Sequence, residues 1–402
     1  TLASSNLTLV PLANIILGGS GANRTVMVIP VAGQNGSTTI TLTVIDAGGL
    51  TAIDTFVVTV PTTTPVRPVG LVGVPQFATG TDANGSATVT VYNPDGSVAT
   101  MLTPFPGFTG GIRTAVAYFN GGTTPEIAVG TGPGTTAEVK ILDMSGNVLF
   151  DVQPFADFTG GVFVAAGYIV NNGNADLAIT PDVSGGPRVE VYEGGDFKEV
   201  ANFYGIDDPN FRGGARAAIG DLNGDGHADL VISAGFGGGP RISIFDGAQL
   251  LQGNFVHPIS DFYAFDPSLR NGVNLAVGDV DGDGVNDVIF GAGPGGGPRV
   301  LIVPGATLIS QGSDAAINAP IANFFAGDPN NRGGVRVAVK NLDGDQYADV
   351  LTGAGQGGGS GIAAYLGKNL AVNTATEDLN FDAFPGYTGG VFVGNHHCEP
   401  RR

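Results

Sequence analysis

Three short acidic segments of the sequence have the residue types and the spacing of a calcium-binding loop. Each segment places an oxygen-bearing side chain at its first, third, fifth and ninth residue, and glycine at its fourth. These residues are Asp221, Asn223, Asp225 and Asp229 in the first loop, Asp279, Asp281, Asp283 and Asp287 in the second, and Asn341, Asp343, Asp345 and Asp349 in the third. Calcium takes about six to eight oxygen ligands from a loop that wraps around it. The sequence therefore predicts one Ca²⁺ in each loop, about three ions in all.

The same residue types also form ordinary hairpin turns, because Asp and Asn side chains hydrogen-bond to the nearby backbone. Three copies in register, each gathering several carboxylates within a short span, favour a cation that offsets their repulsion. A backbone carbonyl near the seventh residue of each loop is expected to supply a further ligand. Those residues are His227, Val285 and Tyr347.

The three loops are not predicted to be equal. The second carries four carboxylates and has Gly284 at its sixth residue, where a left-handed backbone is expected, as at Gly226 in the first loop. The third begins with the neutral Asn341 and has Gln346 where the glycine is expected. We therefore expect the second loop to bind calcium most tightly and the third most weakly.

These loops belong to a longer unit that recurs along the chain. One copy, residues 213–247, reads as a strand, an acidic turn, a strand, a glycine-rich bend and a strand. Each copy opens with a pair of small residues, and the second residues of successive pairs are 50, 53, 58, 62 and 56 positions apart. The pairs are Gly110–Gly111, Gly160–Gly161, Gly213–Gly214, Asn271–Gly272, Gly333–Gly334 and Gly389–Gly390. A period of about 50–60 residues with about four strands per unit indicates the blade of a β-propeller.

Each repeat also ends on a group of aromatic residues, which we expect to pack between adjacent blades. The groups are Phe105 and Phe108, Phe155 and Phe158, Phe203 and Tyr204, residues 262–265, Phe324 and Phe325, and Phe381 and Phe384. Three arginines that follow proline, Arg188, Arg241 and Arg299, recur with the same period. We interpret them as braces between blades, with ligand binding as the alternative.

The chain enters this pattern in the middle of a repeat. Residues 72–107 contain three strand-like runs, and the missing first strand is found at residues 387–394. Pairing the two segments would close the ring and remove both open edges. The prediction is an all-β protein with a six-bladed propeller over residues 70–395, closed by a split blade.

Residues 1–61 have a different pattern, with five short alternating runs separated by glycine and asparagine turns. The runs are LTLVP, NIILGG, RTVMVIP, TTITLTVIDAGG and LTAIDTFVVTV. They indicate a small β-sandwich, shorter than the usual length of about 100 residues, so the chain is expected to start inside this domain. Residues 62–69 read as a stiff Pro/Thr linker and residues 396–402 as a tail, whose two histidines and Cys398 offer a metal site as the alternative.

GDLNGDGHADLVISAGFGGGP and GDVDGDGVNDVIFGAGPGGGP resemble the FG-GAP repeats of integrin α-subunit propellers and the related bacterial VCBS repeats. This resemblance covers about residues 70–395. It implies an extracellular propeller with calcium in the hairpin between the first two strands of a blade, often serving adhesion. The chain departs from the integrin pattern in having six repeats instead of seven and only three intact loops. Separately, residues 37–60 resemble the last hairpin of bacterial immunoglobulin-like or cadherin-like modules.

Two other repeats have lost the oxygen-bearing set and are predicted to hold no metal. Their corresponding residues are Tyr118, Asn120, Gly122 and Glu126, and Tyr168, Val170, Asn172 and Asp176. A metal retained in only some blades favours a structural role for it.

Composition excludes several classes of function. The net charge of −19 leaves no basic stripe for nucleic acid. No run approaches the ~18 apolar residues of a membrane helix, and any secretory signal is expected to lie upstream of Thr1 or to have been removed. A single cysteine allows no disulfide within the chain. His227 and His257 cannot be matched with a nucleophile on sequence alone, so no catalytic set is predicted.

The sequence thus favours a non-enzymatic, extracellular or cell-surface calcium-binding propeller that acts in adhesion or as a scaffold. Its partner would be a protein or glycan on a propeller face, or further copies of itself. One alternative is a self-assembling subunit of a surface layer or filament. Another is a carbohydrate-binding propeller or a glycan-active enzyme, for which an exposed aromatic pocket or paired carboxylates at the channel mouth would be the respective signs.

Overall fold

The computed structural model describes residues 2–20, 23–28, 31, 36–45, 48–60 and 76–394. The chain divides into two compact units, Thr1–Pro68 and Val69–Arg402. The predicted linker at residues 62–69 and the predicted tail at residues 396–402 lie outside the described residues. Within the described ranges, no helix has both the length and the apolar character needed to cross a membrane.

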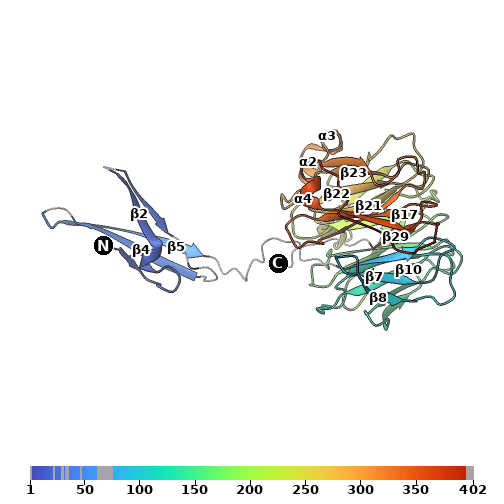
Figure 1. Ribbon diagram of the computed structural model, residues 1–402, viewed down its shortest axis with the longest axis horizontal. Coiled ribbons are helices and arrows are strands. Elements are labelled where there is room, and N and C mark those ends of the chain that lie inside the picture. The colour runs from blue at the N-terminus through green and yellow to red at the C-terminus, as the bar shows by residue number, and fades with distance from the viewer. Residues whose placement is uncertain are drawn as a thin grey trace. The chain divides into compact units, whose positions relative to one another are not determined.

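The larger unit consists of six four-stranded antiparallel sheets, consistent with a six-bladed propeller (Figure 1). The first sheet contains β29 (Val391–Val393), β6 (Phe77–Thr81), β7 (Val89–Tyr92) and β8 (Val98–Leu102). The second contains β9 (Ile112–Ala117), β10 (Glu126–Thr131), β11 (Val139–Leu142) and β12 (Val148–Val152), and the third β13 (Val162–Gly167), β14 (Asp176–Pro181), β15 (Arg188–Tyr192) and β16 (Glu199–Tyr204). The fourth contains β17 (Ala215–Gly220), β18 (Asp229–Ala234), β19 (Arg241–Phe245) and β20 (Phe262–Tyr263). The fifth contains β21 (Val273–Gly278), β22 (Asp287–Ala292), β23 (Arg299–Val303) and β24 (Ala322–Phe325), and the sixth β25 (Val335–Lys340), β26 (Asp349–Ala354), β27 (Gly361–Tyr365) and β28 (Leu379–Asp382).

The first strand of each sheet is an inner strand that contacts the inner strands of the neighbouring sheets. These strands are rich in Ala and Val, and every residue of β9, β17 and β25 is buried. Glycines in the adjoining strands allow the sheets to approach closely. A Cβ added at Gly291 or Gly353 would lie 2.6 Å from the backbone oxygen of Val335 or Val391, respectively.

Members of the predicted aromatic groups pack between adjacent sheets, and so does Phe150, which the prediction did not include; the predicted Tyr204, Tyr263 and Phe325 are instead exposed. In each pair, an aromatic ring from the fourth strand of one sheet packs against a ring from the third strand of the next sheet, or in one pair from its second strand. The pairs have ring centroids 4.7–6.2 Å apart and are Phe150–Tyr192, Phe203–Phe245, Phe262–Phe290, Phe324–Tyr365 and Phe381–Tyr92. Such contacts add to the burial energy that holds neighbouring sheets together.

Strand β29 supplies the inner strand of the first sheet, far from β6 in sequence. Val391 pairs with Thr81, Phe392 with Gly80 and Val393 with Thr79.

Four short helices accompany the last three sheets. They are α1 (Gly247–Leu250), α2 (Gly305–Gln311), α3 (Ser313–Asn318) and α4 (Gly367–Leu370). Helices α1, α2 and α4 each begin directly after the third strand of a sheet, and these are the three sheets whose first two strands are joined by an acidic loop.

The smaller unit contains two small sheets. Strands β1 (Leu2–Ser4), β4 (Gly36–Ile45) and β5 (Thr51–Val60) form one, and β2 (Ile15–Ser20) and β3 (Asn23–Val28) form the other, with a short 3-10 turn at Leu12–Asn14. Leu9, Val10, Ile15 and Ile40 make a buried cluster. The described strands of this unit form two sheets, and both the predicted sandwich and its immunoglobulin-like or cadherin-like identity stay predictions.

One predicted strand of this unit is wrong. The run LTLVP, residues 7–11, is a turn. The Asn6 side chain accepts a hydrogen bond from the Leu9 amide at 3.1 Å, and the Asn6 carbonyl accepts one from the Val10 amide at 2.9 Å. Asparagine thus bends the chain so that both apolar side chains enter the core, where alternation alone indicated a strand.

Candidate functional site: acidic loops and a cleft between two sheets

The second acidic loop joins β21 to β22 and brings three carboxylates together. One oxygen from each of Asp279, Asp281 and Asp283 lies within 4.8 Å of the others. Asp279 is held by the Gly282 amide, which donates to Oδ1 at 2.7 Å, and by the Gly284 amide, which donates to Oδ2 at 2.9 Å. Gly284 has the expected positive φ of 89°. Burial raises the pKa of Asp279 to about 6, with smaller contributions to this rise from nearby Asp283 and Asp281.

The first loop joins β17 to β18 and repeats this backbone arrangement. Asp221 accepts hydrogen bonds from Gly224 at 2.6 Å and Gly226 at 2.9 Å, and Gly226 has φ 88° as predicted. Asn223 stands at the third position and donates to Asp229 Oδ1 at 3.4 Å. The first loop therefore has the same backbone conformation as the second, but it contains one carboxylate fewer for binding a cation.

The third loop, between β25 and β26, already contains a cation from the chain itself. Lys368 Nζ lies 2.5 Å from Asp343 Oδ2 and 3.7 Å from Asp345 Oδ2. The Asn341 amide donates to the Asp345 carbonyl oxygen at 2.8 Å, so its nitrogen is directed into the loop. The lysine was not predicted, although the sequence carries a signal for it: the corresponding residues Ala248 and Ala306 of the other two sheets have no charge.

The ninth residue of each loop is a buried carboxylate that holds the backbone. Its Oδ2 accepts from the residue after the loop's first position, and its Oδ1 from a glycine 18 residues further along. The pairs are Asp229 with Leu222 and Gly247, Asp287 with Val280 and Gly305, and Asp349 with Leu342 and Gly367. Burial raises the pKa of Asp229 and Asp349 to about 7, and that of Asp287 well above its usual value.

The same carboxylate persists where no calcium loop is predicted. Asp176 accepts from Val170 at 2.8 Å and from Gly194 at 2.9 Å, and Glu126 accepts from Phe119 at 2.8 Å. The ninth position therefore has a structural task that does not depend on a metal.

These observations allow a test of fit for Ca²⁺. Carboxylate and amide oxygens are the ligands that calcium prefers. The second loop fits, because three carboxylates converge from one turn, and they need a positive charge to be ionised together. Asp279, Asp281 and Asp283 would hold the ion there, and its contribution would be to stabilise the turn. The ligand roles of the other predicted residues, and of the three seventh-position carbonyls, stay predictions.

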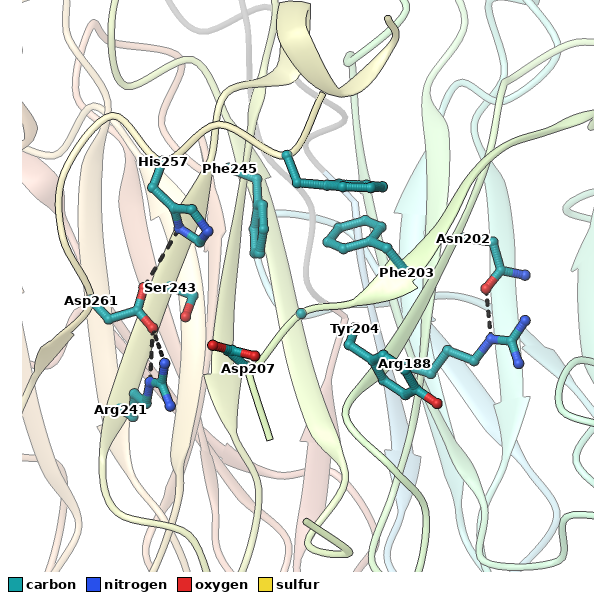
Figure 2. A pocket seen from close by; sticks show the side chains of 12 residues that line it. Arg188, Asn202, Phe203, Tyr204, Asp207, Arg241, Ser243, Phe245, His257 and Asp261 are labelled. Carbon is teal, nitrogen blue, oxygen red and sulfur yellow. Dashed lines mark hydrogen bonds and ion pairs between the residues drawn. The ribbon is translucent and has the colours of Figure 1, made fainter. Parts of the chain in front are cut away.

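A second candidate site is a cleft of about 660 Å³ between the third and fourth sheets, here called the inter-sheet cleft. It is lined by Arg188, Asn202, Phe203, Tyr204, Gly205, Asp207, Arg241, Ser243, Phe245, Phe255, His257 and Asp261. Figure 2 shows Phe203 and Phe245 at its centre, with Arg241, Asp261 and His257 on one side and Arg188 and Asn202 on the other.

The aromatic rings of the cleft support one another. Phe203 stacks on Phe255 with centroids 4.7 Å apart, and Phe245 lies 4.3 Å from the His257 ring. Tyr204 is 55% exposed and Phe255 49% exposed. Two large apolar faces therefore stay accessible to a ligand.

The arginines of the cleft are fixed by partners within their own sheets. Arg188 Nε donates to Asn202 Oδ1 at 2.6 Å, and Arg241 contacts Asp261 Oδ2 through Nε at 2.8 Å and Nη2 at 2.5 Å. Arg299 likewise donates to Asn323 at 3.0 Å. These hydrogen bonds link the third strand to the fourth-strand side of one sheet, so they do not brace neighbouring blades. Arg299 also lies over the ring of Phe265 from the preceding repeat, 5.3 Å from its centroid, which is a contact of the expected kind. Arg188 and Arg241 face the cleft.

Two polar groups of the cleft have no side-chain hydrogen-bond partner within the part of the chain that the structure describes. They are the buried Ser243 hydroxyl and the Asp207 carboxylate. His257 Nδ1 lies 3.5 Å from Asp261 Oδ1. No hydrogen bond joins Ser243 to His257 among these residues.

Comparisons with known proteins identify the repeat. A family model described as FG-GAP-like repeat matches residues 221–290, which include the first and second acidic loops. Among solved structures, the chain is similar to the rhamnogalacturonan lyase YesW, with TM-score 0.36 and 15% identity over 90% of this chain and 70% of that one. It is also similar to a chain of a nidogen/laminin complex (TM-score 0.44, 10% identity, 80% of this chain and 100% of that one). A third is the V. cholerae biofilm matrix protein Bap1 (TM-score 0.32, 15% identity, 69% and 40%).

These structural similarities are too low to assign a function. The repeat match, the six four-stranded sheets and the acidic loops between first and second strands nevertheless agree with one another. Residues 221–290 are therefore FG-GAP-like repeat sequence, within a unit of six four-stranded sheets that is consistent with a six-bladed propeller.

Proposed function

We propose that this propeller is a non-enzymatic, extracellular calcium-binding protein that acts in adhesion by holding a glycan in the inter-sheet cleft. The observation that carries the proposal is the combination of exposed aromatic faces and fixed polar groups in one cleft. Tyr204 and Phe255 present apolar surface, while the Arg188–Asn202 and Arg241–Asp261 pairs are already ordered. Clefts of this composition bind small polar molecules, because rings supply contact area and a few placed polar groups supply orientation.

Pre-ordered polar groups matter for the strength of binding. A side chain that is already fixed by its neighbour loses little conformational freedom when a ligand arrives. Asp207, whose carboxylate accepts no hydrogen bond from the described residues, is free to accept one from a sugar hydroxyl. A polyhydroxylated ligand uses both features, since its C–H faces cover the rings and its hydroxyls meet the polar groups.

The proposal is tested by binding to a panel of immobilised neutral and acidic polysaccharides. Tyr204→Ala and Phe255→Ala should each weaken binding by about tenfold, as expected for truncated aromatic anchors. Tyr263→Ala is the matched control, because Tyr263 is similarly exposed at 49% but does not line the cleft. Equal losses for all three variants, or binding that none of them affects, would place any glycan elsewhere.

The same panel distinguishes binding from catalysis. A non-enzymatic protein releases no new reducing ends or unsaturated products from any bound polysaccharide over a long incubation. Product release that Asp207→Asn abolishes would instead favour a glycan-active enzyme.

We propose that calcium serves this function structurally, with one ion in each of the three acidic loops. An ion that binds only the folded state stabilises it. A chelator should therefore lower the unfolding temperature of the propeller and leave the transition of the N-terminal unit in place. Two unshifted transitions in differential scanning calorimetry would make the ions incidental.

A second candidate function is self-assembly through the N-terminal unit. Strand β5 pairs with β4 on one side, and no described strand pairs with its other edge. Large apolar side chains near this hairpin are exposed, including Val44 at 68%, Ile53 at 66% and Val57 at 64%. An open, apolar edge is a template for pairing with another chain. Sedimentation in calcium tests this: polymers that Ile53→Lys dissolves would favour assembly over glycan binding.

A further inference from the structure

The second residue of each inner strand faces a common space where the six strands converge. Around the ring these residues are Arg113, Phe163, Arg216, Asn274, Arg336 and Phe392, so arginines alternate with uncharged side chains. All six line both an inner space of about 50 Å³ and a wider cavity of about 270 Å³, here called the axial cavity. The loops that line the axial cavity follow the second strand of each sheet. The acidic loops precede the second strand, so they lie at its other end.

Two of the three arginines have a carboxylate partner. Arg113 Nη2 lies 2.5 Å from Asp182 Oδ2, and Arg336 Nη2 forms an ion pair with Asp82. In both cases the aspartate is the residue that follows the second strand of the next sheet around the ring. This arrangement defines a position at which each arginine can find its counter-ion.

For the third arginine, Arg216, the residue at the corresponding position of the next sheet is a glycine. Asp82 follows Thr81, which pairs with Val391, and Asp182 follows Pro181, which pairs with Val162. The corresponding residue in the fifth sheet is Gly293, because it follows Ala292, the partner of Val273. A Cβ at Gly293 would lie 1.9 Å from the Asn271 carbonyl oxygen, so this backbone admits no side chain.

Arg216 is therefore a buried cation without a carboxylate of its own. It is 8% exposed, its Nη1 donates to the Val273 carbonyl oxygen at a long 3.4 Å, and its guanidinium lies 5.2 Å from the Phe163 ring centroid. Its Nε–H has no hydrogen-bond partner in the described part of the chain. A buried donor without a partner, on a charged group, costs substantial free energy unless a ligand supplies the acceptor.

The charged residues that line the axial cavity also indicate that Arg216 lacks a counter-ion. Its charged lining residues are the three arginines with Asp82 and Asp182, which leaves one positive charge uncompensated. Asp182 also acts on Arg216 electrostatically, but it is already bonded to Arg113. Burial lowers the pKa of Arg216 to about 10, so the guanidinium stays charged at neutral pH. In a chain of net charge −19, this is a local site of the opposite sign.

We infer that the axial cavity binds a small carboxylate anion that takes the place of the missing third aspartate and accepts hydrogen bonds from Arg216. The carboxylate can belong to a free small acid or to a sugar acid. Arginine pairs with carboxylates through two parallel hydrogen bonds, which makes this group a better match than a spherical anion. This site is separate from the inter-sheet cleft and does not depend on the function proposed for that cleft.

Calorimetric titration of the calcium-loaded full chain tests the inference, with sodium acetate for the free acid and sodium D-glucuronate for the sugar acid. Acetamide and D-glucose are the matched neutral compounds, and sodium chloride keeps ionic strength constant. Saturable binding of acetate, glucuronate or both, with no binding of the neutral compounds, is the expected result. Binding of acetate alone would identify free acids as the source, and binding of glucuronate alone would identify sugar acids.

Variants locate the binding. Arg216→Gln should weaken it by about tenfold or more, as loss of a charge-assisted pair does, while Arg299→Gln on an outer strand should leave it within about twofold. Asn274→Asp places a carboxylate on the neighbouring inner strand and should abolish binding in a folded protein. Equal heats for acetate and acetamide would overturn the inference with the wild-type protein alone, as would unchanged affinity in Arg216→Gln.

Discussion

The ninth residue of each acidic loop shows how one carboxylate can serve the fold before it serves a metal. Asp229, Asp287 and Asp349 each accept two backbone hydrogen bonds, and Asp176 also accepts two, from Val170 and Gly194, without a calcium loop around it. These buried groups join the hairpin to the start of the segment after the third strand. A carboxylate in this place is consequently not, by itself, a sign of calcium.

Asp176 makes stability depend on pH. Burial raises its pKa to about 7, against 3.8 for an exposed aspartate. Between about pH 4 and 7 the folded state therefore binds a proton that the unfolded state has lost, and stability falls as pH rises through this window. One pKa unit corresponds to about 1.4 kcal/mol, so the loss is of the order of a few kcal/mol.

Comparison with Asp176→Asn isolates this group, since all other carboxylates are common to both proteins. In chelator, the free energy of unfolding of the wild type minus that of the variant should decrease from about pH 4 to 7 and level off above. Urea unfolding at several pH values measures it. A difference that grows with pH would mean that the folded state favours the charged form.

The calcium affinities of the loops should follow their charges. Asp283→Ala should remove the tightest site, because it breaks the triad of Asp279, Asp281 and Asp283. Asp345→Ala should change total binding less, since Lys368 already neutralises part of the third loop. Titration calorimetry on calcium-free protein ranks the two variants, and equal losses would contradict the order.

Lys368→Met tests whether the lysine competes with calcium at the third loop. Removing the ammonium group frees Asp343 and Asp345, so calcium binding at the third loop should tighten by about tenfold. Lys140→Met, which removes a lysine far from the loops in sequence and paired with Glu138, should leave calcium binding unchanged. If Lys368→Met weakens the third site, the lysine supports the loop and does not compete with the ion.

The repeated hairpins depend on glycines that follow the third strand. Gly247, Gly305 and Gly367 donate to the ninth-position carboxylates, and a Cβ at Gly305 would lie 1.7 Å from the Asn286 carbonyl oxygen. This close approach brings the segment after the third strand against the hairpin. It also explains the constant spacing of 18 residues between carboxylate and glycine.

Gly305→Ala should destabilise the propeller by about 3 kcal/mol or more, because backbone must move to admit the methyl group. Gly361→Ala is the control, since a Cβ there meets nothing within 4 Å and its backbone is not left-handed. Denaturant unfolding compares the two variants. Similar losses in both would show that glycine contributes through chain entropy and not through the close contact.

The larger unit as a whole depends on a strand from the opposite end of its sequence. β29 pairs with β6 and contacts β9 and β25, the inner strands of the adjoining sheets. Without it, the edge of β6 would be open and the first sheet would lack its inner strand. We expect this pairing to hold the ring closed.

Deletion of residues 387–402 should therefore cause aggregation or unfolding, while deletion of residues 395–402 alone leaves β29 in place and should not. Size-exclusion chromatography and thermal unfolding of both truncations provide the measurement. A monomeric 1–386 protein with an unchanged unfolding temperature would show that the ring does not need this strand.

Local residue patterns were sufficient to predict the repeats, the six sheets and the acidic loops. Strand alternation, turn residues and the spacing of carboxylates all act over a few positions, so they can be read along the chain. The turn at residues 7–11 was missed because a single asparagine side chain there outweighs the alternating pattern.

The contacts that decide which sites carry charge or accept a ligand arise only from the tertiary structure. Lys368 is 25 residues from Asp343, and Arg336 is 254 residues from Asp82. The inter-sheet cleft and the unpaired Arg216 likewise exist only where separate repeats meet. Whether a charged side chain is neutralised depends on its distance in space from a group of opposite charge. The packing of the six sheets sets these distances, and the sequence of a single repeat does not specify which repeats lie beside it.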